Sequence, residues 1–205
     1  MRSCRWVRSG LATAAILVLS GCATSRRAAE VSRAATALPA MAWDHRPEAA
    51  QWTRATLAAI RSDGAVLLDI VPGDIARWCP AYPRAGSRQR AAFWAGLLSV
   101  LAGHESTWRP EAEGGGGRWI GLTQIDPRTA RAFGCRATTK AELKDGAANL
   151  ACAVRIASAQ VERDAQVAGG PGAWRGLARD WAPFRSLTKR AEMTAWTSAQ
   201  DYCRK

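Results

Sequence analysis

The sequence predicts a mainly α-helical fold, and three observations support that prediction. Apolar residues recur at helical spacing in several segments, most clearly at Trp94, Leu97, Leu98 and Leu101. No segment alternates apolar and polar residues as a half-buried strand does, and no internal repeat is visible. The chain has 205 residues, 48% of them hydrophobic with ten Trp, which is enough for one domain with a buried core.

The first half of the domain is expected to contain three helices. One spans residues 48–61, and the apolar segment 66–70 fits either a strand or a helix. A turn then leads into a short helix that ends at Trp78. A long helix begins near Ser87, which we expect to be its N-cap, and this helix contains Glu105.

The second half is expected to contain three more helices. The glycine-rich segment 113–118 is predicted to be a mobile loop, and it lacks the Lys-Ser/Thr ending of a phosphate-binding loop. A helix begins near Asn149, and the glycine-rich segment 169–172 breaks the chain after it. Helices around residues 174–181 and 187–198 complete the chain.

The N-terminal segment has the pattern of a bacterial lipoprotein signal peptide. Arg2, Arg5 and Arg8 precede an apolar run over residues 11–19, which is too short for a stable transmembrane helix. The sequence Leu-Ser-Gly-Cys that ends at Cys22 resembles a lipobox, the site where such signals are cleaved and the new terminal Cys is lipidated. The alternative is an ordinary secretory signal with an incidental Cys.

This pattern predicts how the chain is divided and where it is located. Residues 1–21 are expected to be the signal peptide, residues 22–47 the lipidated Cys22 and a flexible tether, and residues 48–205 the domain. The residue after Cys22 is Ala23 rather than Asp. By resemblance to sorting in Gram-negative bacteria, we expect a periplasmic protein with a lipid anchor in the outer membrane.

The charge of the chain favours an anionic partner. There are 29 Lys and Arg against 17 Asp and Glu, and the formal net charge is +12, of which the signal peptide contributes three. Such an excess suits nucleic acid, an anionic cell-wall polymer or a membrane surface equally well. The basic residues are spread out and not interleaved with aromatic residues, so no nucleic-acid partner is expected.

The cysteines fit an oxidising compartment. Beyond the lipobox four remain: Cys79, Cys135, Cys152 and Cys203. Two disulfides are therefore predicted, and of the three possible pairings we favour Cys135–Cys152 and Cys79–Cys203. No metal site is expected, because the spacings are wide and the only histidines are His45 and His104.

Glu105 is the most informative single residue. It continues the apolar stripe of its helix by one turn, so its carboxyl group is expected on the buried side. Desolvation raises the pKa of a carboxyl group and makes it a usable proton donor near neutral pH. The alternative is a polar residue that merely ends an amphipathic helix.

Three short motifs, taken together and in order, resemble the soluble lytic transglycosylase family, which shares the goose-type lysozyme fold. They are Glu105-Ser106, Gly121-Leu122-Thr123-Gln124-Ile125 and Asn149-Leu150, the last followed by an amphipathic helix. The segment Cys79-Pro80-Ala81-Tyr82 resembles the lead-in of the small bacterial lipoproteins with a single such domain. The resemblance extends over about residues 78–203 and implies a lysozyme-like helical domain.

The resemblance also implies an activity. It is the cleavage of the bond between N-acetylmuramic acid and N-acetylglucosamine in peptidoglycan glycan strands, with formation of an anhydro-muramic end. Glu105 would act first as general acid and then as base, without a cofactor. The residues expected to bind substrate are Ser106, Gly121, Leu122, Gln124, Asn149 and Trp181. Local alternatives stay open: a helix hydrogen bond for Ser106, a helix cap for Asn149, and core packing for Trp181, Trp108 and Trp119.

Two residues depart from the family's pattern. Thr123 stands where the family has Met, and Asp180 stands where the family has a Tyr that reaches the catalytic Glu. A second carboxylate at Asp180 would suit a muramidase that hydrolyses the same bond with water. A peptidoglycan-binding lipoprotein without catalysis is the remaining alternative. The expected partners are thus glycan strands and, through the lipid on Cys22, a membrane.

Overall fold

A computed structural model describes residues 37–170, 172 and 174–204. The predicted signal peptide, Cys22 and the first part of the predicted tether lie outside the described residues. The compact unit begins at Leu38, ten residues before the expected boundary. Trp43 is fully buried and donates a 2.9 Å hydrogen bond from Nε1 to Thr53 Oγ1. The last ten residues assigned to the tether therefore pack as part of the domain.

The described unit is mainly helical, as the sequence predicts. Its first elements are α2 (Ala49–Arg61), α3 (Val66–Asp69), α4 (Ile75–Trp78), the 3-10 turn η1 (Tyr82–Arg84) and α5 (Ser87–Ser106). Then come β1 (Glu113–Gly114), β2 (Trp119–Ile120), α6 (Pro127–Ala132), α7 (Lys140–Leu143) and α8 (Gly146–Asp164). The chain ends with η2 (Gly176–Arg179), η3 (Ala182–Arg185), α9 (Leu187–Ser198) and η4 (Asp201–Cys203). Among the described residues, no helix is long and apolar enough to cross a membrane.

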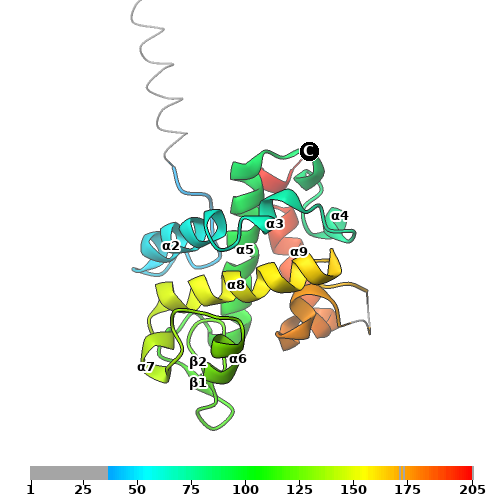
Figure 1. Cartoon of the computed structure of the whole chain (residues 1–205). Helices are drawn as coiled ribbons and strands as arrows, with labels where there is room; N and C mark the ends of the chain where they lie inside the picture. The colour runs from blue at the N-terminus through cyan, green and yellow to red at the C-terminus, as the bar shows by residue number, and fades with distance from the viewer. Residues whose placement is uncertain (1–36, 171, 173, 205) are drawn as a thin grey trace, which may run out of the picture. The chain divides into compact units, whose positions relative to one another are not determined.

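The long helix α5 forms the centre of the core. Every residue from 91 to 102 is buried, so the helix is covered on all sides rather than along the single stripe expected from its sequence. Figure 1 shows α8 crossing α5, with α2 beside α8 and α9 on the other side of α5. Trp94 Nε1 donates to Leu67 O at 2.9 Å, which satisfies a buried indole and ties α3 to α5.

Two disulfides staple the domain, with the pairing favoured from the sequence. Cys79 is bonded to Cys203 and links α4 to the C-terminal turn η4. Cys135 is bonded to Cys152 and links the segment after α6 to α8. Each bridge restricts the unfolded chain and thereby stabilises the folded one.

Several local expectations need correction. Ser87 is the first residue of α5 rather than its cap, and Gly86 precedes it with its N–H bonded to Gln89 Oε1. Segment 66–70, for which strand and helix were both left open, contains the helix α3 over Val66–Asp69. Segment 113–118 is not a simple loop, because β1 and β2 pair antiparallel around a tip of glycines with positive φ. Around residues 174–181 only the 3-10 turn η2 forms.

Candidate functional site

Glu105 lies in the last turn of α5 and is half-buried. Burial raises the pKa of its carboxyl group to about 7, while the positive charges of Lys189 and Arg185 act in the opposite direction. Within the described part of the chain, its carboxylate accepts no hydrogen bond and forms no ion pair. The group is therefore available to a ligand and titrates close to neutral pH.

The two cations near Glu105 come from the C-terminal part of the domain. Lys189 lies in the first turn of α9, and one turn further along Glu192 contacts His104 at 3.6 Å. Arg185 ends η3, where its Nε and Nη2 donate to two main-chain carbonyls, each at 2.6 Å. Its guanidinium also lies 3.8 Å from the ring centroid of Trp174. These contacts hold a fixed positive charge beside the carboxyl group.

Ser106 connects the end of α5 to the loop that follows β2. Its hydroxyl lies 2.9 Å from Leu122 O and 3.1 Å from Ala102 O, and it accepts from Arg109 N at 3.2 Å. The residue is buried, so its contacts are internal. The Ser106 hydroxyl therefore joins the end of α5 to the loop after β2, and its bond to Ala102 O is the local helix bond left open from the sequence.

The loop after β2 has a backbone that only certain residues accept. Gly121 has φ +79°, and a Cβ at this position would collide with Leu143 O and the Asn149 amide. Leu122 is fully buried. Gln124 also has a positive φ, and its Nε2 donates to Gly121 O at 2.9 Å and to Ala112 O at 3.2 Å. Leu122 thus packs in the core, and Gln124 braces the loop and remains partly exposed.

Asn149 is hydrogen-bonded to this loop and does not cap a helix, which corrects the capping role. The N-cap of α8 is Asp145, whose carboxylate accepts from Ala148 N at 2.8 Å. Asn149 is completely buried in the first turns of α8. Its Nδ2 donates to Ile120 O and Leu143 O, both at 3.0 Å. All the hydrogen-bonding capacity of the amide is used once its two bonds from Thr123 are added.

Trp181 is buried against the loop after β2 and does not offer an exposed ring face on which a sugar could stack. It is 3% exposed, and its Nε1 donates to Thr123 O at 2.9 Å. Trp108 is half-buried and donates to Ser99 O. Trp119 in the hairpin is 46% exposed, and Trp174 near Arg185 is 58% exposed. Trp174 was not among the Trp residues considered for sugar contact from the sequence.

The nearby acidic residues differ from Glu105 in their surroundings. Asp126 caps α6 and is bonded to Arg118 at 2.9 Å and Arg128 at 3.0 Å, which holds its pKa far below the usual range. Glu113 is paired with Lys144 at 2.6 Å, which lowers its pKa. Both are therefore ionised structural groups and not proton donors.

Asp180 is bonded to Gln160 and not to Glu105. Its Oδ2 accepts from Gln160 Nε2 at 2.7 Å. Desolvation of the carboxyl group raises its pKa although the residue as a whole is exposed, while this bond and the charge of Arg185 oppose the rise. Asp180 therefore shares a cation with Glu105 and makes no direct contact with it.

Comparison with known proteins found a family model and solved structures that are similar to this chain. The model of the Transglycosylase SLT domain matches residues 85–164, which include α5, the hairpin, the loop after β2 and α8. No curated protein matches the chain.

Solved structures of Bd0314 DslA are similar over the domain. A Glu→Gln variant has a TM-score of 0.75 at 28% identity, covering 82% of this chain and 100% of that chain. The wild-type form 2 has a TM-score of 0.74 at 28% identity, with the same coverage. Family match and fold support a peptidoglycan-active function like that of a lytic transglycosylase. Residues 85–164 thus match the transglycosylase SLT domain, and the described unit has a lysozyme-like, mainly helical fold.

Proposed function

We propose that the protein is a peptidoglycan lytic transglycosylase in which Glu105 is the general acid and base. One observation carries the proposal: a carboxyl group at the end of a buried helix has a pKa of about 7 and no hydrogen-bond partner among the described residues. A group that is partly protonated at neutral pH can donate a proton and then accept one in the same turnover.

The reaction proceeds in two proton transfers. Glu105 donates its proton to the oxygen between N-acetylmuramic acid and N-acetylglucosamine, and the bond from that oxygen to C1 of the muramic sugar breaks. The N-acetyl group of the muramic sugar stabilises the positive C1. The Glu105 carboxylate then takes the proton of the sugar's own C6 hydroxyl, whose oxygen bonds to C1 and closes the anhydro ring. No water is consumed, and Glu105 ends protonated for the next cycle.

The surrounding hydrogen bonds support this role by making the site rigid. Ser106 links the catalytic helix to Leu122, and Asn149 and Trp181 hold the same loop through Thr123. A preorganised site does not have to be ordered when substrate binds, so more binding energy is available to the transition state. In this proposal the exposed Trp119 and Trp174 are the aromatic surfaces that contact sugars.

A muramidase that uses water is the second candidate, and Asp180 favours it. Its raised pKa and its position beside Arg185 would suit a second carboxyl group in the site. The hydrogen bond from Gln160 occupies one of its oxygens. The two reactions differ in product, since hydrolysis leaves a reducing end and transglycosylation an anhydro end.

Digestion of purified peptidoglycan, followed by mass spectrometry, tests the proposal. The intact protein is compared with Glu105→Gln and with Glu111→Gln, an exposed matched control. Anhydro ends from the parent and the control, but none from Glu105→Gln, support the proposal. Reducing ends would indicate the muramidase, and bound sacculi without products a binding protein. Equal anhydro yield from all three proteins would exclude Glu105 as the acid.

We also propose that the protein is periplasmic and held at the outer membrane by lipid on Cys22. The lipobox supports this, and the two disulfides fit an oxidising compartment. Metabolic labelling with a fatty acid in a Gram-negative host tests it. We expect label in the parent and in the Cys4→Ser variant, and no label in the Cys22→Ser variant. Label retained in Cys22→Ser would contradict lipidation at that residue.

A further inference from the structure

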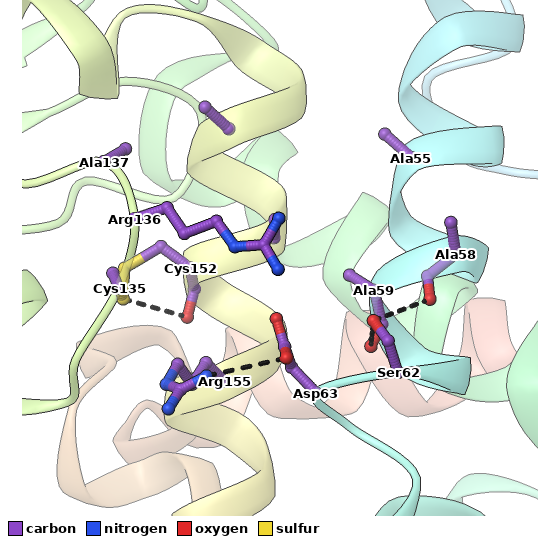
Figure 2. Close-up of a pocket in the computed structure, with 12 residues that line it drawn as sticks. Ala55, Ala58, Ala59, Ser62, Asp63, Cys135, Arg136, Ala137, Cys152 and Arg155 are labelled. Atoms are coloured by element: carbon purple, nitrogen blue, oxygen red, sulfur yellow. Dashed lines mark hydrogen bonds and ion pairs between the residues drawn. A yellow bond between two sulfur atoms is a disulfide. The ribbon is translucent and has the colours of Figure 1, made fainter.

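A pocket of about 340 Å³ lies apart from the site around Glu105. It is formed between the C-terminal half of α2, the N-terminal half of α8 and the segment that starts at Cys135 (Figure 2). None of the residues that surround Glu105 or the loop after β2 lines it. The residues that line this pocket therefore have no part in the proposed cleavage reaction.

The walls of the pocket are made of small apolar groups on a rigid frame. Six alanines contribute methyl groups: Ala55, Ala58, Ala59, Ala137, Ala148 and Ala151. The Cys135–Cys152 disulfide joins two sides of the pocket and is itself buried. Because alanine has no rotamers to lose, such walls are formed before any ligand arrives.

One positive charge at this pocket is unbalanced. Arg155 bonds to Phe133 O at 2.8 Å and lies 3.6 Å from Asp63, so its charge has a partner. Arg136 is exposed and extends across the pocket in Figure 2. Among the residues that the structure describes, it has no hydrogen-bond or ion-pair partner. A free guanidinium beside an apolar surface suits a ligand with one carboxylate and small apolar groups.

We propose that this pocket binds the carboxyl end of a peptidoglycan stem peptide, with the carboxylate on Arg136 and terminal alanine methyl groups against the alanine walls. The inference rests on peptidoglycan being the substrate, as in the proposed function. A stem peptide that ends in D-alanyl-D-alanine has both required features, a free carboxylate and two methyl side chains. The pocket then gives the enzyme a second point of attachment to the wall, independent of the catalytic residue.

Calorimetric titration with N-acetyl-Lys-D-Ala-D-Ala tests the proposal. The free acid is expected to bind, and its C-terminal carboxamide to bind at least tenfold more weakly, because the charge-assisted hydrogen bonds are lost. Arg136→Gln is expected to cause the same loss for the free acid. Arg84→Gln removes the same charge at an exposed position outside the pocket and should leave binding unchanged.

A second pair of variants tests the apolar walls. Ala58→Phe fills the pocket from an exposed position on α2 and should abolish binding, whereas Ala50→Phe on the same helix, outside the pocket, should not. Equal binding of acid and carboxamide, or unchanged binding by Arg136→Gln, overturns the proposal. Equal binding of an L-Ala-L-Ala peptide overturns it too, in favour of a protein C-terminus. The probe has no glycosidic bond, so its binding is measured independently of whether Glu105 cleaves glycans.

Discussion

Thr123 and Asn149 are joined by two hydrogen bonds that end on a single oxygen. Thr123 donates from its backbone N at 3.0 Å and from its hydroxyl at 2.7 Å, and both bonds reach Asn149 Oδ1. Thr123 O in turn accepts from the indole of Trp181. Thr123 stands where Met was expected, and its hydroxyl satisfies the buried amide oxygen of Asn149.

Asn149→Leu is expected to destabilise the protein by about 2–4 kcal/mol, because buried main-chain groups would lose their partners. Thr123→Val removes only the hydroxyl bond and should cost about 1 kcal/mol. Chemical denaturation of both variants measures the difference. Equal losses in the two variants would contradict the assigned network.

Gly121→Ala is expected to destabilise the protein by about 2–4 kcal/mol and to lower activity, because a Cβ would collide with Leu143 O in a backbone with positive φ. Gly116 is the matched control: its φ is +68°, and a Cβ there meets nothing within 4 Å. Gly116→Ala should therefore cost only about 1 kcal/mol. Thermal unfolding separates the steric effect from the conformational one, and similar melting temperatures for the two variants would argue against the collision.

Glu105→Gln is expected to change how stability depends on pH. In the folded protein burial raises the pKa of Glu105 to about 7, above its unfolded value. The protonated group is favourable at low pH, and that contribution is lost as pH rises toward and through 7. The free energy of unfolding of the variant, relative to that of the parent, should therefore rise by about 1–3 kcal/mol from pH 4 to pH 8.5. Urea unfolding at both pH values measures this, and a parallel pH dependence of the two proteins would show that Glu105 is not desolvated.

Lys189→Gln is expected to move the alkaline limb of the pH–rate profile to higher pH. The positive charge of Lys189 lowers the pKa of Glu105, so its removal lets that pKa rise. Glu105 must be protonated to act as the acid, and activity then persists to higher pH. Initial rates between pH 5 and pH 9 provide the test. Lys140→Gln, which removes a cation paired with Glu113, serves as a control with an unshifted limb.

The local patterns of the sequence were sufficient for most helices and for the two disulfides. Helical spacing placed the long helix that ends at Ser106, and the four cysteines of the domain pair as favoured. The boundary expected at Glu48 was wrong because Trp43 has no periodic neighbours, although the fold buries it completely. The capping role of Asn149 was wrong because α8 begins at Gly146, three residues before the start inferred from the apolar pattern, and Asp145 is its cap.

By itself the sequence determined the fold class, the family motifs and the residue to suspect as the acid, because periodicity and motif order are properties of neighbouring residues. Only the tertiary structure decided what each polar side chain contacts. Ser106 and Trp181, which lie far apart in the chain, both bond to the loop of Leu122 and Thr123. The desolvation of Glu105 and the free charge of Arg136 likewise depend on which elements pack nearby. Hydrogen-bond partners and burial are set by long-range packing, and no local pattern encodes them.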